Sequence, residues 1–504
     1  MSSIGLSRRP GNTWISSLQA FYAGSRWCTV RVRRGRGPAT REVIMDADTL
    51  HNRLSRRLCA AAVVLYLGLG CTSAGAAGAP RRPAAVSTSA TWRASVSSSS
   101  QQGNGASDDY RPAISDDGRY VVFASRATNL VAGDTNGRYD VFVRDLATHV
   151  TSRISITSTG GQSNGDSFKP SITPDGSEIV FYSVATNLVP GDTNGEFDCF
   201  LWRRSAPNTI RRVSVSSSGQ QGTGGSVGSH DPTISADGNW VAWESEATNL
   251  VPNDTNQSQD AFLRNLTTGV TTRENLGPGG IQALGGTVGT HDPHMSSDGR
   301  WMVFYSDQTN LVLNDTNHHR DEFLRDTVNG VTRRISLTPS GGQSNGESYE
   351  PWISDDGRYV TFASGASNLV SGDSNGKGDI FLADVSLSPP KITRASVSSS
   401  EAQGNGSSNV PAVAPDGHYV CFLSFASNLV SGDTNAHADM FVRDIVAGVT
   451  RVASVSSSGH LANGDSSGCA VGSAGGTYVA FKSVATNLVP GDTNGVADVF
   501  RHRF

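Results

Sequence analysis

The segment Ser115-Asp116-Asp117-Gly118-Arg119-Tyr120-Val121-Val122-Phe123 contains the pattern on which the whole chain is built. It predicts a tight turn at Asp117-Gly118, where glycine supplies a positive φ, and then a β-branched and aromatic strand. A short apolar strand at 112–115 precedes the turn. The same pattern recurs at 235–243 and 354–362, so the chain is built from repeats of a strand–turn–strand unit.

A second motif, Asp-[Thr/Ser]-Asn, occurs once in each repeat and shows how many repeats there are. It begins at Asp134, Asp192, Asp254, Asp315, Asp373, Asp433 and Asp492, at intervals of 58, 62, 61, 58, 60 and 59 residues. The first unit predicts strands at 112–115, 120–123, 141–144 and 150–156, with a loop between the second and third. Four short strands per unit and no helix indicate one blade of a β-propeller. A β-helix is the competing repeat fold, but its repeats are much shorter.

The two ends of the repeat region predict how the ring closes. The last unit stops at its third strand, at 499–501, and residues 91–97 match the fourth strand of other units, such as 394–398. We therefore predict an all-β, seven-bladed propeller of four-stranded antiparallel blades over residues 91–504. The N-terminal strand completes the last blade, which removes the open sheet edges.

The motif S-x-D-G-x-[Y/W]-V-x-F, carried by 115–123, 235–243 and 354–362, resembles the TolB-type (WD-repeat-like) propeller repeats of bacterial envelope and secreted proteins. The resemblance covers about 91–504. It implies the fold and leaves the function open, because such propellers include scaffolds, partner-binding domains and a few lyases. The seventh copy, at 473–476, departs from the motif because it lacks the Asp.

The first ninety residues predict export. Arg53, Arg56 and Arg57 precede a short apolar run at 60–70, and Ala74-Gly75-Ala76 resembles a cleavage site. We expect a signal peptide at 45–79, a linker at 80–90, and a leader or mis-assigned start at 1–44. Cys71 follows a weak lipoprotein box. The mature chain should be periplasmic or secreted, with no transmembrane segment.

Charge and cysteine content limit the partners. Residues 1–90 hold 13 Lys and Arg and 3 Asp and Glu; of the totals of 41 and 45, this leaves 28 basic and 42 acidic residues, a net charge near -14, for the rest. Such a body repels polyanions, so nucleic acid is not an expected partner. Cys199, Cys421 and Cys469 are an odd, sparse set, from which no disulfide scaffold is expected.

Propeller topology predicts which face binds. The turns between strands one and two and between strands three and four are short and share one face. The loops between strands two and three and between blades are long and share the other. Long loops carry binding more often than short turns. We therefore expect a protein or glycan partner on the long-loop face of a monomer.

The repeated loop Asp-[Thr/Ser]-Asn-x-x-x-Asp has two interpretations. It offers two carboxylates and one amide oxygen, which Ca²⁺ prefers as ligands. Equally, these side chains cap local amides in Asx-turns, with no metal. The residues concerned are Asp134, Asn136, Asp140, Asp192, Asn194, Asp198, Asp254, Asn256, Asp260, Asp315, Asn317, Asp321, Asp373, Asn375, Asp379, Asp433, Asn435, Asp439, Asp492, Asn494 and Asp498.

A single ligand site should lie where the repeats differ. The residue before the first strand's proline varies most and should line the channel mouth; its occupants are Arg111, Lys169, Asp231, Asp292, Glu350 and Val410, with Cys469 in the seventh repeat, which lacks the proline. His230, His291 and His294 lie nearby, and they either hold a divalent ion or face solvent in capped turns. These residues, Val410 and Cys469 excepted, form the predicted ligand site. A polysaccharide-acting lyase or hydrolase is the alternative function, and we assign no catalytic residues.

Overall fold

The structure is a computed structural model that describes residues 89–107, 111–284, 286–473 and 477–504, together with four strands within residues 4–45. Residues 87–504 form one compact unit and residues 1–86 another. The predicted signal-peptide features, including Cys71, and the turn at 474–476 lie outside the described residues.

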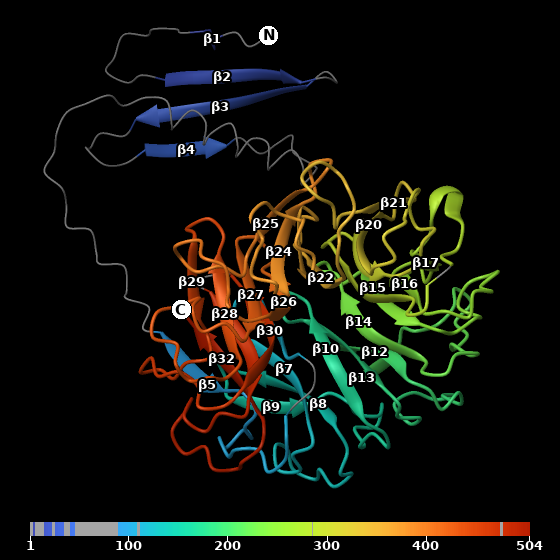
Figure 1. Cartoon of the computed structure of the whole chain (residues 1–504), viewed down its shortest axis with the longest axis vertical. Coiled ribbons are helices and arrows are strands. Elements are labelled where there is room, and N and C mark those ends of the chain that lie inside the picture. The colour runs from blue at the N-terminus through green and yellow to red at the C-terminus, as the bar shows by residue number, and fades with distance from the viewer. Residues whose placement is uncertain are drawn as a thin grey trace, which may run out of the picture. The chain divides into compact units, whose positions relative to one another are not determined.

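Seven four-stranded antiparallel sheets make up the larger unit (Figure 1). Blades 1 and 2 consist of β6 (Ala113–Ile114), β7 (Tyr120–Ser125), β8 (Asp140–Asp145), β9 (Val150–Arg153), and β10 (Ser167–Ile172), β11 (Glu178–Ser183), β12 (Asp198–Arg203), β13 (Ala206–Arg212). Blades 3 and 4 consist of β14 (Ser229–Ile234), β15 (Trp240–Ser245), β16 (Asp260–Asn265), β17 (Thr271–Arg273), and β18 (Thr290–Met295), β19 (Trp301–Ser306), β20 (Asp321–Asp326), β21 (Val331–Arg334).

Blades 5 and 6 consist of β22 (Ser348–Ile353), β23 (Tyr359–Ser364), β24 (Asp379–Asp384), β25 (Lys391–Arg394), and β26 (Ser408–Val413), β27 (Tyr419–Ser424), β28 (Asp439–Asp444), β29 (Val449–Val452). Blade 7 consists of β30 (Ser466–Gly472), β31 (Tyr478–Ser483), β32 (Asp498–Arg503) and β5 (Ala90–Arg93). A single-turn 3₁₀ helix, η1 (Pro278–Gly280), lies in the loop between blades 3 and 4.

The N-terminal strand closes the ring, as predicted. β5 pairs antiparallel with β32, with Trp92 opposite Arg501. Ala94 donates a backbone hydrogen bond of 2.7 Å to Val499, which continues the pairing beyond the strand. The count of seven blades and the closure by the first strand are therefore confirmed.

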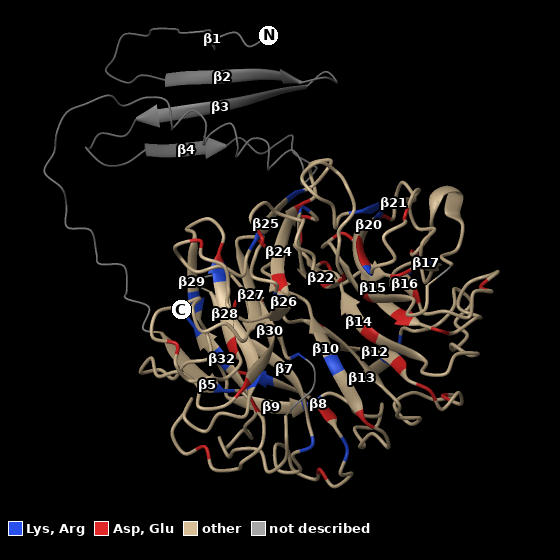
Figure 2. Ribbon diagram, viewed as in Figure 1, with Lys and Arg blue, Asp and Glu red and all other residues tan. Residues whose placement is uncertain are grey.

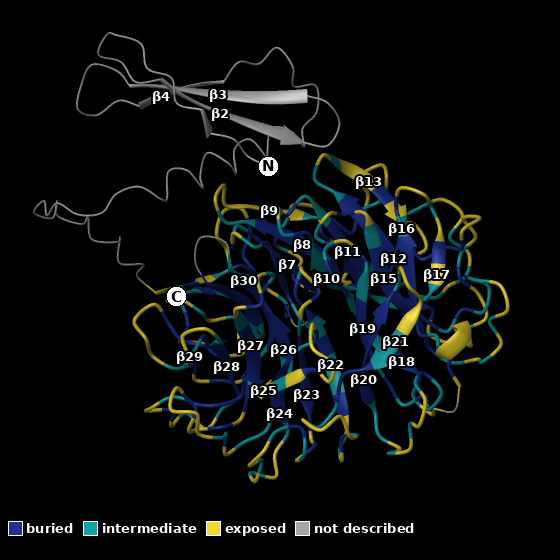
Figure 3. Cartoon of the chain, turned by 90° about the horizontal axis from the view of Figure 1, so that it is seen from above, coloured by how far each residue is buried: buried dark blue, intermediate teal, exposed yellow. Residues whose placement is uncertain are grey.

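Each blade contributes one stacked aromatic pair to the core. The second and third strands place two aromatic rings opposite each other with centroids 5.8 to 5.9 Å apart in every blade, as for Phe123 and Phe142. These rings are buried between neighbouring blades, and exposure rises toward the loops (Figure 3). The apolar residues of the repeated motif thus form the interfaces between blades.

The glycine of the repeated turn has a specific packing role. Gly118 has a φ of 68°, and an added Cβ would lie 2.4 Å from the ring of Tyr478 in blade 7. The same contact joins Gly176 to Tyr120, one blade further on. The aromatic residue and the glycine of the motif therefore bind neighbouring blades together.

One disulfide joins two neighbouring blades. Cys421 of β27 is bonded to Cys469 of β30, and both residues are fully buried. The sequence had led us to expect no disulfide framework, and this bond corrects that expectation for one pair. The odd count leaves Cys199 as a free, buried thiol.

We expected residues 1–44 to be a leader. Four strands at 4–45 pair in sequence order in a sheet of their own: β1 (Ile4–Gly5), β2 (Ile15–Tyr22), β3 (Arg26–Arg34) and β4 (Arg41–Met45). Across the described residues, no helix has the length and apolar character needed to cross a membrane.

Candidate functional site

The innermost strand of most blades contains a β-bulge. The register of β10 with β11 shifts between Phe168 and Ser171, and the same shift recurs in blades 3 to 7. At the bulge, five blades place a non-glycine residue with a φ of 44° to 58°: Lys169, Asp231, Asp292, Glu350 and Val410. A bulge redirects a side chain, and here all five line the central channel.

In blade 7 the structure assigns a different residue to this position than the comparison of the repeats did. The register of β30 with β31 makes Gly468, with a φ of 64°, the counterpart of Val410. Cys469, which we had assigned to the channel mouth, takes the place of the proline and forms the disulfide instead. The position before the proline could not be identified in a repeat that has no proline.

A cavity of about 580 Å³ occupies the centre of the ring and is lined by residues from all seven blades. Its volume lies within the range of ligand pockets. All eight ligand-site residues predicted from the sequence line it: Arg111, Lys169, His230, Asp231, His291, Asp292, His294 and Glu350. The structure therefore brings the predicted residues into one cavity.

The cavity wall is asymmetric. Blades 1 to 5 contribute its ionic side chains and blades 2 to 5 its aromatic ones, whereas blades 6 and 7 contribute only small or apolar side chains: Val410, Ala412, Val413, Pro415, Ala470 and Val471. Because the seven scaffolds are equivalent, this difference comes from side-chain identity. A single oriented ligand site needs such asymmetry.

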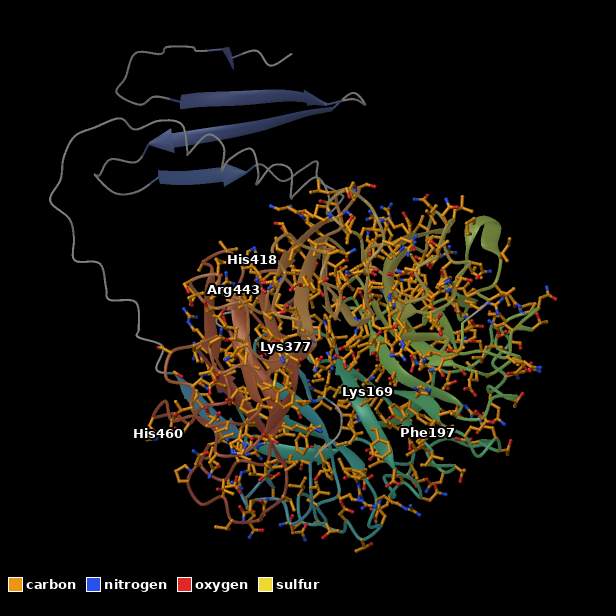
Figure 4. The ribbon with its side chains drawn as sticks, viewed as in Figure 1. Lys169, Phe197, Lys377, His418, Arg443 and His460 are labelled. Carbon is orange, nitrogen blue, oxygen red and sulfur yellow. A yellow bond between two sulfur atoms is a disulfide. The ribbon has the colours of Figure 1, made fainter. Side chains whose placement is uncertain are left out.

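Lys169 is at the centre of an ion cluster. Its ammonium contacts Asp231 of blade 3 and lies 3.0 Å from Asp292 Oδ1 of blade 4. Figure 4 shows Lys169 near the middle of the propeller, and Figure 2 shows basic and acidic segments on the neighbouring strands β10 and β14. Burial alone would lower the pKa of Lys169, but the two carboxylates raise that pKa well above its usual value.

Glu244 connects the carboxylates to two histidines. It is almost fully buried on β15 and accepts a hydrogen bond of 2.8 Å from the backbone N–H of Asp292. Glu244 Oε1 lies 2.9 Å from His230 Nδ1, and Oε2 lies 3.4 Å from His291 Nδ1. Against the effect of burial, the hydrogen bonds that the His230 imidazole donates to the carboxylates of Asp231 and Glu244 raise the pKa of His230 to about 10, and Glu244 likewise raises the pKa of His291.

A second group crosses the channel from blade 1. Arg111 donates a hydrogen bond of 2.8 Å to the carbonyl of Pro411, and its guanidinium lies 3.8 Å from Glu350 and 5.5 Å from the centre of the Trp352 ring. His294 packs against the same ring, with centroids 4.0 Å apart. Burial lowers the pKa of His294 to about 3, so this histidine is neutral at pH 7.

Partly exposed aromatic rings line the blade 2 side of the cavity. Tyr182 and Phe197 both line the cavity, and their ring centroids are 5.2 Å apart. Phe168 packs against both rings, and Tyr182 lies 6.1 Å from the ring of His230. These rings lie where β10 and β12 begin and β11 ends, on the face that carries the long loops.

The ligand site predicted from the sequence left out several cavity residues. Glu244, Tyr182 and Tyr305 occupy one equivalent position of the second strand, where blades 1 and 5 have alanine. Trp352 follows the proline of β22. Comparison of all seven copies at this second-strand position would have found three of them.

The repeated acidic loops form dense hydrogen-bond networks. In every blade the Asn side-chain amide donates to the last Asp over 2.7 to 3.2 Å, as Asn136 does to Asp140. Ser155 also donates to Asp140, over 2.5 Å. The Asn oxygen accepts the backbone N–H two residues on, an Asx-turn, in all seven loops.

An arginine lies between the two carboxylates of the loop in six blades. Arg153 Nη1 lies 3.2 Å from Asp134 and 3.4 Å from Asp140. The equivalents are Arg212, Arg273, Arg334, Arg394 and, in blade 7, Arg93, with distances of 2.7 to 3.5 Å. Blade 6 has Val452 in this position. In six loops the guanidinium thus occupies the place between the carboxylates that a metal would need.

Glu322 is an unusual buried carboxyl behind the cavity. It is fully buried on β20, and neither carboxyl oxygen has a hydrogen-bond partner. The six equivalent residues are Val141, Cys199, Ala261, Ile380, Met440 and Val499. Burial, together with the charges of Asp292 and Glu350, raises the pKa of Glu322 well above its usual value.

Comparison with known proteins gives a likeness of fold. No protein-family model matches the chain, and no curated protein matches its sequence. Solved structures similar to it include TolB from Acinetobacter baumannii, with 12% identity, a TM-score of 0.38, and coverage of 87% of this chain and 78% of that one. The β-propeller domain of the trilobed protease from Pyrococcus furiosus is similar with 9% identity, a TM-score of 0.46, and coverage of 79% and 95%. The acylaminoacyl peptidase of Pyrococcus horikoshii is similar with 10% identity, a TM-score of 0.43, and coverage of 78% and 50%. TolB-type propellers are among the structural neighbours of this seven-bladed propeller.

Proposed function

We propose that this protein is an exported binding protein that takes a glycan into the central cavity from its long-loop face. The observation that carries the proposal is the asymmetric cavity of about 580 Å³, with ionic and aromatic side chains on blades 1 to 5 and only small or apolar ones on blades 6 and 7. A purely structural channel would have no need for such differences between blades.

The chemistry of the cavity favours a glycan over a protein. The faces of Tyr182, Phe197 and Trp352 suit the apolar faces of sugar rings, and the charged groups suit hydroxyls. A protein partner typically needs about 800 Å² of surface on each side, mainly on a flat or convex face. A protein that inserts one segment into the cavity is the alternative partner.

Export is supported by the leader and by the disulfide. The apolar run at 60–70 with its basic flank is typical of a signal peptide. The bond between Cys421 and Cys469 is of the kind that persists in oxidising compartments. We place the mature protein in the periplasm or outside the cell, as a monomer.

A glycan array followed by calorimetric titration of the hits tests the proposal. The F197A and Y182A variants should bind a hit at least tenfold more weakly than the wild type. W92A is the matched control, because Trp92 is a 41% exposed aromatic residue on the outermost strand of blade 7. If no glycan binds, but a protein is retained by the wild type and lost with F197A, the protein alternative holds.

A polysaccharide-acting lyase or hydrolase is the second candidate function. The observation in its favour is the cluster of His230, Asp231 and Glu244, in which the pKa of His230 is raised and that of Asp231 is lowered, because shifted pKa values in a cavity are typical of acid–base sites. Incubation of the protein with each bound oligosaccharide, followed by mass spectrometry, tests it. Cleavage that is lost in H230A would support an enzyme, and intact sugar would leave the binding role.

Calcium is a further proposed ligand, at the acidic loops. Its support is the oxygen-rich pattern of the loops. Blade 6 is the best place to test it, because Val452 leaves the carboxylates of Asp433 and Asp439 without the arginine of the other blades.

A further inference from the structure

Three metal-ligating side chains converge at the long-loop end of the cavity. His230 and Asp231 are consecutive on β14, and Glu244 pairs directly with His230 on β15. His230 Nδ1 lies 2.9 Å from Glu244 Oε1 and 3.9 Å from Asp231 Oδ2. One ligand atom from each residue lies within 4.8 Å of the other two.

These separations are close to those in a metal coordination sphere. Zinc binds imidazole nitrogen and carboxylate oxygen at about 2.0–2.2 Å. Neighbouring ligands in a tetrahedral or octahedral sphere of that radius lie about 3.0–3.5 Å apart. The 2.9 Å distance from His230 Nδ1 to Glu244 is close to this range, whereas the 3.9 Å distance to Asp231 exceeds it, so the Asp231 carboxylate would have to rotate toward the ion.

The cluster is rich in oxygen ligands. Three carboxyl side chains, those of Asp231, Asp292 and Glu244, gather around the single ammonium of Lys169, which contacts Asp231 and lies 3.0 Å from Asp292 Oδ1. Carboxylate oxygens beside an imidazole nitrogen form a donor set that suits a divalent cation.

The surroundings hold the histidine in place. Gln259 is nearly buried, and its side-chain amide lies 3.1 Å from His230 Nε2. The amide nitrogen and oxygen of a glutamine are interchangeable in such an assignment, so the Gln259 side-chain oxygen can accept a hydrogen bond from Nε2–H when Nδ1 binds a metal. His291 Nδ1 lies 3.4 Å from Glu244 and provides a fourth group nearby.

We propose that His230, Asp231 and Glu244 bind one divalent transition-metal ion, such as Zn²⁺, inside the cavity. Two carboxylates and one imidazole suit Zn²⁺ or Mn²⁺, and three protein ligands leave a coordination position for water or a ligand oxygen. The site uses a different set from the three histidines suggested by the sequence, because His294 packs against Trp352 instead. It does not depend on which partner enters the cavity.

Metal binding can be measured directly on the purified chain. Chelator-stripped protein is titrated with Zn²⁺ and Mn²⁺ by calorimetry, and bound metal is counted after dialysis. We expect one ion per chain, and Co²⁺ in its place should give the visible absorption of a site with nitrogen and oxygen ligands. The wild-type titration alone overturns the proposal if no ion binds at a stoichiometry near one.

Variants locate the ion. H230A and E244Q should each weaken binding at least tenfold; E244Q keeps the shape of the side chain. H319A is the matched control, since His319 Nδ1 lies 3.2 Å from Glu347 in an exposed pair that lacks a third ligand. Binding should stay within twofold of wild type in H319A. Unchanged affinity in H230A and E244Q, with native circular dichroism, would place the ion elsewhere and reject the site.

Discussion

Lys169 Nζ of blade 2 lies 3.0 Å from Asp292 Oδ1 of blade 4, so a single side chain connects two blades that are not neighbours in the ring. It also contacts Asp231 of blade 3, the blade between them. Neighbouring blades are held by apolar interfaces, whereas this cluster holds three blades at the channel.

Removal of Lys169 should destabilise the protein. In K169M the two carboxylates lose their counter-ion, and we expect the free energy of unfolding to fall by about 2 kcal/mol. This loss of free energy is smaller than for a fully buried ion pair because the side chains are 17 to 21% exposed. Urea unfolding measures it, with K377M, a substitution at an exposed lysine, as the control. Equal midpoints for K169M and wild type would show that the cluster contributes nothing to stability.

Replacement of Glu322 should stabilise the protein. Methionine occupies the equivalent position in blade 6, and a buried carboxyl without a hydrogen bond costs about 2 kcal/mol. E322M should therefore raise the free energy of unfolding by about that amount. A lower stability of E322M would mean that the carboxyl has a partner of its own.

The same residue should make stability depend on pH. The pKa of Glu322 is raised in the folded state, so the folded protein holds this proton more tightly than the unfolded chain does. Its contribution favours folding at low pH and weakens as pH rises above about 4.3, the value for an unfolded glutamate. The difference in unfolding free energy between E322M and wild type should therefore grow from pH 4 to pH 8. A constant difference would contradict the raised pKa.

The architecture could be predicted from the sequence because the same pattern of strands and turns occurs in seven repeats. The motif at 115–123 indicated the turn and the strand, and the match of 91–97 to a fourth strand indicated the closure. The contact of Gly118 with Tyr478 could not be predicted, because it joins one repeat to the last. A pattern within one repeat contains no information on which blades face each other.

The site was predicted in part, for a similar reason. The bulge residues vary beside a proline, which made Lys169 and Asp231 recognisable. Glu244 and Trp352 reach the cavity through strand register and bulge geometry, which sequence spacing does not reveal. The arginine between Asp134 and Asp140 was likewise hidden, because β9 contributes it after an intervening strand and turn.

Removal of one loop arginine should lower the free energy of unfolding. In R153A two buried carboxylates lose their shared counter-ion, and we expect a loss of about 3 kcal/mol in the free energy of unfolding. R119A is the control, because Arg119 pairs with Asp145 at the surface with its side chain 40% exposed and should have little effect. If R153A unfolds at the wild-type urea concentration, the loop does not depend on its arginine.

Reduction of the disulfide should lower the thermal stability of the protein. The bond spans 48 residues between blades 6 and 7, and a loop of that length corresponds to about 4 kcal/mol in the chain-entropy account. Reductant should lower the melting temperature of the wild type and have no effect on a C421A/C469A double variant. An identical response of both proteins would mean that reductant acts elsewhere.

Calcium should act through blade 6. Asp433 and Asp439 lack the arginine that lies between the equivalent carboxylates elsewhere, so a cation meets less competition there. A weak site with a Kd of about 10⁻⁴–10⁻³ M, in 10 mM Ca²⁺, would add about 1.4–2.7 kcal/mol of stability by mass action. The melting temperature should rise with Ca²⁺ and return with a chelator, and D433N should abolish this response while D134N, in a loop that has its arginine, should keep it. A chelator-independent melting temperature in the wild type would reject calcium and leave the loops as Asx-turns held by arginine.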